Sequence, residues 1–128
     1  MNELQKIESE LYQPSKALLD DLKALDGDII FLGAGGKMGP GMIKLASIAL
    51  QEAGISKKLI AVSRFSDEAA KKELQDLGVE VIPADLLDEA QLQALPDVKN
   101  VMYLAGTKFG TKGNEPFTWA MNAYLPGR

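Results

Sequence analysis

Three regularly spaced glycines, Gly33, Gly36 and Gly39, follow directly after the apolar run DIIFL at 28–32 and precede a helical pattern. A chain that leaves a buried strand and at once begins a helix presents unpaired N–H groups at the positive end of the helix dipole. Such a junction favours anions, so we expect the stretch GAGGKMG to hold a phosphate group. The expected contact residues are Gly33, Ala34, Gly35, Gly36, Lys37, Met38 and Gly39.

Spacing separates three kinds of phosphate-binding loop at this position. A P-loop needs a Lys-Ser or Lys-Thr pair, but here the lysine is followed by Met38, and Phe31 stands where the first P-loop glycine belongs. The pattern GxGxxG requires a glycine at position 38, whereas GxxGxxG fits the triplet without adjustment. In dinucleotide-binding turns the successive glycines allow a tight turn, close approach of the pyrophosphate, and close packing of the helix. The alternative is a tight strand-to-helix turn that binds nothing.

The end of the second apolar run bears on which dinucleotide would bind. An acidic residue there hydrogen-bonds the ribose 2′-OH of NAD, whereas a basic residue accommodates the 2′-phosphate of NADP. The sequence reads AVSRFSD, with Ser63 and Arg64 at the strand end. Asp67 lies further on, where either Ser66 or Asp67 is expected to cap the next helix. We therefore expect NADP in preference to NAD; in the alternative interpretation Arg64 is a solvated loop residue.

Apolar periodicity and turn residues predict the elements that position these groups. Two short helices lead, the first ended by Pro14 and the second capped by Ser15; strands and helices then alternate four times. This order predicts an α/β, Rossmann-like parallel sheet with helices on both faces and a ligand at the carboxyl ends of its strands. The division is a helical extension at 1–27 and a nucleotide-binding domain at 28–128. The predicted strands are 28–32, 58–63, 79–83 and 100–106, and the predicted main helices 38–53, 67–77, 88–95 and 115–125.

Four stretches resemble the extended short-chain dehydrogenases/reductases, the NAD-dependent epimerase/dehydratase family. They are GAGGKMG after the first strand, ADLLD after the third, VMYLAG at the fourth, and Asn122 in the following helix. The resemblance implies that Asp85 contacts adenine with Leu86 near it, and that Ala105 and Gly106 line the nicotinamide-side ribose and phosphates. It also implies a catalytic task for Asn122, in the proton relay. The alternatives are a turn or cap for Asp85 and a helix-to-strand hydrogen bond for Asn122.

The resemblance implies an NAD(P)(H)-dependent oxidoreductase, epimerase or dehydratase that moves a hydride at a carbinol carbon of a small or nucleotide-linked sugar substrate. The catalytic serine and Tyr-xxx-Lys pair of that family are missing, because residues 107 and 128, four after Tyr103 and Tyr124, are not lysines. We therefore expect the chain to be the first part of a longer protein, interrupted after the fourth strand. The apolar side of that strand should cause self-association, so we expect a homo-oligomer.

Two other functions remain open at this point. Dihydrodipicolinate-reductase-like enzymes also resemble GAGGKMG, although they begin at the glycine strand and not after a helical lead. A non-catalytic module that binds NAD(P) and acts on a partner through the leading helices is the alternative from a different class.

Composition excludes several classes of chemistry. The chain has no histidine and no cysteine, so zinc hydrolysis, a thiolate metal site and a Ser-His-Asp triad are unavailable, and no metal site is predicted. A net charge of -4 without a basic block argues against nucleic acid, and no apolar run is long enough for a membrane span. We expect a cytoplasmic protein. Trp119, at helical spacing near Phe117 and Met121, is predicted to lie in the core.

Overall fold

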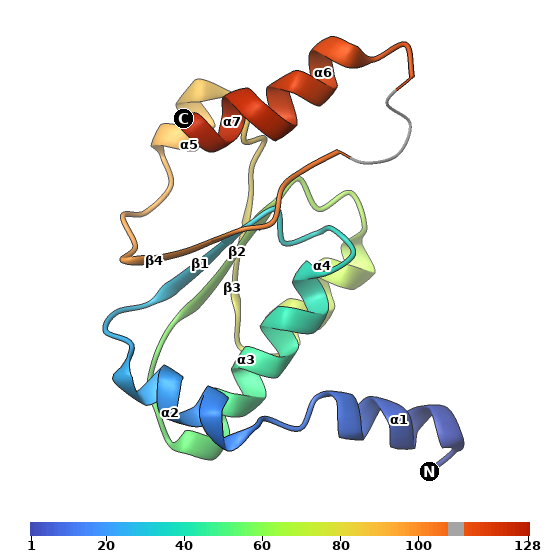
Figure 1. The fold of residues 1–128 in the computed structure, drawn as a ribbon, viewed down its shortest axis with the longest axis vertical. Helices are drawn as coiled ribbons and strands as arrows, with labels where there is room; N and C mark the ends of the chain where they lie inside the picture. Colours follow the sequence, from blue (N-terminus) through green and yellow to red (C-terminus); the bar gives the residue numbers. More distant parts are fainter. Residues whose placement is uncertain (108–111) are drawn as a thin grey trace.

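The centre of the protein is a four-stranded, all-parallel β-sheet with strand order β3-β2-β1-β4. The computed structural model describes residues 1–107 and 112–128. Helices flank the sheet, so the predicted α/β, Rossmann-like fold is confirmed (Figure 1). Because all strands are parallel, their carboxyl ends share one edge of the sheet. The strands are β1 Ile29–Leu32, β2 Leu59–Ser63, β3 Glu80–Pro83 and β4 Asn100–Tyr103.

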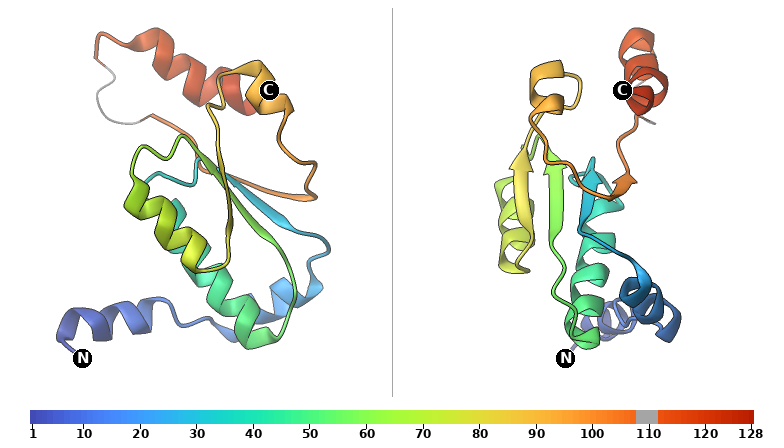
Figure 2. Two further views of the ribbon diagram at one scale, coloured as in Figure 1. Left: turned by 180° about the vertical axis from the view of Figure 1, so that it is seen from behind. Right: turned by 90° about the vertical axis from the view of Figure 1, so that its left-hand side faces the viewer.

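The helices occupy two regions around the sheet. α3 and α4 run alongside the strands, whereas α5 and the C-terminal helical segment lie beyond the carboxyl ends of the strands (Figures 1 and 2). α2 packs against α3, and α1 extends from the other end of the molecule. The bounds are α1 Glu3–Leu11, α2 Lys16–Ala24, α3 Gly39–Ala53, α4 Glu68–Asp76, α5 Glu89–Gln93, α6 Glu115–Trp119, the π-helix η1 Ala120–Tyr124 and α7 Leu125–Gly127.

The two central strands are buried on both faces, which explains why they read as continuous apolar runs. Successive side chains of a strand point to opposite faces, so β1 and β2 contribute to two separate cores. One core contains Ile29, Phe31 and Ala61 with α3 residues such as Ile43. The other contains Ile30, Ile60, Val62, Ala84, Leu86 and Leu125.

The predicted helix caps at Ser15 and Asp67 are confirmed. The Ser15 hydroxyl accepts a hydrogen bond from the Leu18 amide at 3.1 Å, and Asp67 Oδ1 accepts one from the Ala69 amide at 2.9 Å. Gly54 ends α3 in the left-handed conformation, with φ of 65°. These caps satisfy backbone groups that a helix end leaves without partners, so local sequence determines where the helices begin and end.

Two details differ from the sequence predictions. The fourth strand ends at Tyr103, and residues 104–107 leave the sheet as a loop. Trp119 is 71% exposed, so its predicted place in the core is wrong. Residues two positions apart lie on opposite sides of a helix. Phe117 and Met121, four apart, share the inward side, and Trp119 between them therefore faces outward.

In the described residues, 1–107 and 112–128, we find no helix with both the length and the apolar character needed to cross a membrane.

Candidate functional site

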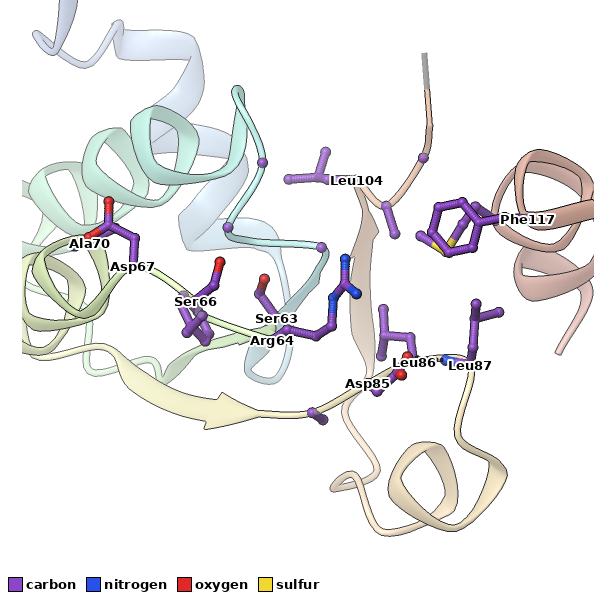
Figure 3. Close-up of a pocket in the computed structure, with 18 residues that line it drawn as sticks. Ser63, Arg64, Ser66, Asp67, Ala70, Asp85, Leu86, Leu87, Leu104 and Phe117 are labelled. Carbon is purple, nitrogen blue, oxygen red and sulfur yellow. Dashed lines mark hydrogen bonds between the residues drawn. The ribbon is translucent and has the colours of Figure 1, made fainter. Parts of the chain in front are cut away.

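A pocket of about 310 Å³ lies at the carboxyl ends of the strands, between the glycine turn and the C-terminal helical segment (Figure 3). It brings together segments that follow all four strands. Its lining residues are Gly33, Gly35, Gly36, Ser63, Arg64, Phe65, Ser66, Asp67, Ala70, Ala84, Asp85, Leu86, Leu87, Leu104, Ala105, Gly106, Phe117 and Met121. This is the edge at which parallel α/β sheets bind ligands.

The first and last glycines of the triplet are required by the chain itself. Gly33 has φ of 88°, and a Cβ placed there would lie 2.4 Å from the Ala105 amide nitrogen. A Cβ on Gly39 would lie 2.3 Å from the Ala34 carbonyl oxygen. Side chains at these positions would force the end of β4 and the start of α3 away from the turn. The two glycines therefore allow the turn and the close approach of its neighbours.

The middle glycine is not required in this way. A Cβ on Gly36 would meet only the Gly33 carbonyl oxygen, at an ordinary contact distance of 3.5 Å, and the φ of Gly36 is not positive. Gly36 lines the pocket, and beyond its chain neighbours no other atom lies within 4 Å of the position that a Cβ would take. A bare backbone at this point lets a ligand approach closely.

Free amide groups accompany this bare backbone. Among residues 1–107 and 112–128, the amides of Gly35, Lys37 and Met38 donate no hydrogen bond to a protein acceptor. They precede α3, whose 15 residues give it a substantial dipole with its positive end at the turn. The turn can therefore offer N–H groups and partial positive charge to an anion, which fits a pyrophosphate.

Arg64 supplies the positive charge of the pocket, directly after β2. Its side chain projects toward the glycine turn, with Ser63 beside it (Figure 3). The next residue, Phe65, is only 7% exposed and has φ of 47°, a left-handed conformation that is rare for a bulky residue. The buried ring of Phe65 is part of the core formed by β1, β2 and α3. This core contact holds the turn that directs Arg64 into the pocket.

The segment after β3 supplies the polar residue Asp85 and the apolar residue Leu86 to the lining of the pocket. Asp85 Oδ1 accepts a hydrogen bond from the Leu87 amide at 3.0 Å, and the Asp85 amide donates to Gln91 Oε1 at 2.8 Å. The predicted local turn at Asp85 is thus present, and Asp85 lines the pocket as well. Asp88 caps α5 through the Gln91 amide at 3.0 Å, but the Gln91 side chain turns back to Asp85 and does not complete a capping box with Asp88.

Asn122 lies outside the pocket lining and holds the loop that follows β4. Its Oδ1 accepts from the Thr107 amide and its Nδ2 donates to the Thr107 carbonyl, both at 2.8 Å. A Cβ on Gly106 would lie 3.3 Å from Asn122 Oδ1, so the amide stands directly against the pocket wall formed by Ala105 and Gly106. Asn122 is thus held by hydrogen bonds, as in the alternative to a catalytic task, but its partner is the loop residue Thr107, four positions beyond the end of β4, and not the strand itself.

Four of the expected contact residues do not line the pocket. Ala34 is fully buried and Gly39 packs against it, so these two build the turn from behind. Lys37 is exposed, and Met38 is 66% exposed. All other residues predicted to bind the cofactor are brought together: Gly33, Gly35, Gly36, Ser63, Arg64, Asp85, Leu86, Ala105 and Gly106.

Sequence reasoning missed the apolar wall of the pocket. Leu104 and Phe117 lie on the side opposite β3, with Leu87 across the opening (Figure 3). Met121 lines the pocket as well. The spacing of Phe117 and Met121, four residues apart, is a usable signal for one helix face, but the same spacing is typical of a core. A hydrogen bond of 3.0 Å from Tyr103 Oη to the Met121 carbonyl ties this wall to β4, and burial raises the pKa of the Tyr103 phenol.

The residues that line the pocket are suited to binding an organic ligand that carries a phosphate group. Among the residues that the structure describes, no three acidic side chains come together as a possible metal site. Donor groups, one guanidinium, the carboxylates of Asp67 and Asp85 and an apolar wall surround a space of about 310 Å³. Such a pocket can hold a phosphate-bearing ligand with an apolar or aromatic part.

The chain matches no protein-family model, and no curated protein or solved structure shows significant similarity to it.

Proposed function

We propose that the pocket binds a nicotinamide dinucleotide, NADP(H) in preference to NAD(H). The observation that carries this proposal is that one pocket is lined by the bare backbone of Gly36, the undonated amide of Gly35 and Arg64. The undonated amides of Lys37 and Met38 follow directly, at the start of α3. The pyrophosphate would accept hydrogen bonds from the turn, where the helix dipole adds favourable charge. The Arg64 guanidinium would donate hydrogen bonds to the 2′-phosphate that distinguishes NADP from NAD.

The chain's own contribution to the reaction is binding and orientation. The nicotinamide, when bound, supplies hydride transfer. Leu104, Ala105 and Gly106 would confine the cofactor on the β4 side, and Asn122 keeps this wall in place through the Thr107 backbone. Asn122 is thus a positioning residue, since both ends of its amide are used by the backbone. The proposal extends to an oxidoreductase, epimerase or dehydratase acting on a small-molecule substrate.

Calorimetric titration of the 128-residue chain with NADPH and, separately, NADH tests the proposal. We expect tighter binding of NADPH, and a loss of this preference in Arg64→Ala. One charge-assisted interaction contributes about 1.5–3 kcal/mol, so the preference should fall by roughly 10- to 100-fold. Arg128→Ala is the matched control, because Arg128 pairs with Glu89 and does not line the pocket. An NADPH-to-NADH ratio that is the same in Arg64→Ala and in the unaltered chain refutes the assignment of Arg64; no binding of either nucleotide refutes the proposal as a whole.

A non-catalytic nucleotide-responsive module is the second candidate, favoured by α1 and α2, which precede the sheet and do not line the pocket. Reduction or oxidation of the bound cofactor by carbonyl or alcohol substrates distinguishes an enzyme from such a module. Turnover by the protein that carries this chain supports the enzyme, whereas nucleotide-dependent association with a partner and no turnover supports the module.

A further inference from the structure

The apolar stripe of α1 faces solvent. Leu4, Ile7 and Leu11 are 66%, 58% and 66% exposed, and no residue of α1 is buried. A flank of α1 that includes the polar residues Gln5, Glu8 and Ser9 borders a hollow shared with α3. An amphipathic helix on a protein surface normally presents its apolar stripe to the core. The orientation of α1 is the reverse of this.

This orientation leaves α1 without the contact that would stabilise it. An isolated helix of nine residues is marginal in water, because helices of this length depend on burying an apolar face. A capping box between Asn2 and Gln5 supports its first turn. At its other end the Lys44 ammonium lies over the Tyr12 ring, 4.5 Å from the ring centroid. A surface outside this copy of the chain is therefore expected to cover the stripe.

A second apolar surface is open on the same chain. A groove of about 510 Å³ lies between α2, α3 and the edge strand β4. Met102 of β4 is 39% exposed on this face of the sheet, and Leu25, which follows α2, is 36% exposed. The apolar part of the lining includes Leu18, Leu22, Leu25, Met42 and Met102.

The two surfaces do not meet within one copy. α1 is directed away from β4 in each view that shows both, and α2, which is joined to α1 by residues 12–15, forms one wall of the groove (Figures 1 and 2). A second copy can bring its own α1 to the groove. In a dimer with a two-fold axis, α1 of each copy then meets the groove of the other.

The exposed area is large enough for such an interface. A folded monomer of 13.8 kDa is expected to expose about 6,600 Å². This chain exposes 8446 Å², about 1,800 Å² more than that expectation. A standard protein–protein interface covers about 800 Å² on each partner. The excess area thus exceeds what each copy would bury in a stable dimer.

We propose that two copies form a symmetric dimer in which α1 of each copy lies, with its apolar stripe inward, in the groove between α2, α3 and β4 of the other. α1 carries three glutamates and one lysine, so an anionic membrane would repel it and a protein surface is the favoured occupant. The dimer is independent of the nucleotide proposal, because none of the groove residues lines the pocket at the glycine turn.

Sedimentation velocity over a concentration series gives the first test. We expect a dimer for the unaltered chain and a dissociation constant at least about 100-fold higher for Ile7→Glu, since the substitution enters both halves of the interface and each buried isoleucine contributes about tenfold or more. Glu10→Gln, on an exposed α1 residue outside the stripe, is the matched control and should leave the dimer unchanged. Circular dichroism must show the same fold for both variants. A monomer at all concentrations, or a dimer that Ile7→Glu does not weaken, overturns the proposal.

Cross-linking tests the pairing itself, and the chain has no cysteine of its own to interfere. Ile7→Cys chains are mixed with Met102→Cys chains and treated with a bismaleimide, which tolerates imprecise spacing. We expect covalent dimers in the mixture and little product from either variant alone. Product from Ile7→Cys alone shows that two α1 helices pair, and product from Met102→Cys alone shows that two β4 edges pair; either result, or no product at all, overturns the proposed arrangement.

Discussion

Replacing Gly36 by alanine separates the needs of the fold from the needs of the proposed ligand. A Cβ at this position meets only the Gly33 carbonyl oxygen at 3.5 Å, and the φ of Gly36 is not positive, so alanine fits the folded backbone. Alanine also restricts the unfolded chain, which stabilises a protein by about 0.4–1 kcal/mol where the native conformation allows it. We therefore expect the thermal midpoint of Gly36→Ala to be unchanged or slightly raised.

Nucleotide binding should respond in the opposite direction. The added methyl group would occupy the space over the turn and keep a pyrophosphate from the amides that precede α3. Loss of one hydrogen bond to a charged group costs about 1.5–3 kcal/mol, which corresponds to roughly a 10- to 100-fold weaker affinity for NADPH. Calorimetric titration of the variant measures this change.

Gly33→Ala is the matched comparison for a glycine that the fold requires. Its φ of 88° and the 2.4 Å approach to the Ala105 amide predict destabilisation by about 2–5 kcal/mol. Equal loss of stability in both variants would refute the distinction drawn between the two glycines. Undiminished NADPH affinity in a stable Gly36→Ala protein would refute the placement of the pyrophosphate.

Two further predictions concern residues that hold the loops around the sheet. Asn122→Ala removes both hydrogen bonds to the Thr107 backbone. We therefore expect the free energy of unfolding, measured in urea, to fall by about 1–2 kcal/mol and the Thr107 amide to exchange its hydrogen faster. Unchanged exchange would contradict the positioning role. The hydrogen bond and charge of Lys99 lower the pKa of Asp26 below its ordinary 3.8, so the small stabilisation from this exposed pair should be present above that pH and be lost as the pH falls through the lowered pKa. Thermal midpoints of the unaltered chain and Asp26→Asn should accordingly converge at low pH, and a difference that grows on acidification would show that the sign is wrong.

The fold and the polar half of the site could be predicted because their signals are local. A buried parallel strand reads as a short apolar run, and a cap such as Ser15 or Asp67 acts on amides two or three residues away. The glycine triplet and Arg64 stand directly after two such strands, and in a parallel sheet those positions necessarily meet at one edge.

The remaining features depend on contacts between distant segments. The pairing of Asn122 with Thr107 spans 15 positions, and the spacing of Phe117 and Met121 is equally compatible with a core. The left-handed backbone of Phe65 has no sequence signal, because the conformation is enforced by burial of its ring. The outward orientation of the apolar stripe of α1 also opposes the usual expectation for an amphipathic helix.

The adjacent residues Arg64 and Phe65 have separate roles, one facing the pocket and the other holding the backbone turn. Phe65 holds the backbone turn through the core, whereas the exposed Arg64 meets whatever enters the pocket. A substitution at position 64 is therefore expected to leave the turn intact, whereas a substitution that removes the Phe65 ring from the core is expected to change the direction of residue 64. Selection for a different ligand could accordingly act on one codon without a cost in folding, which makes position 64 the natural starting point for redesigning the specificity of this pocket.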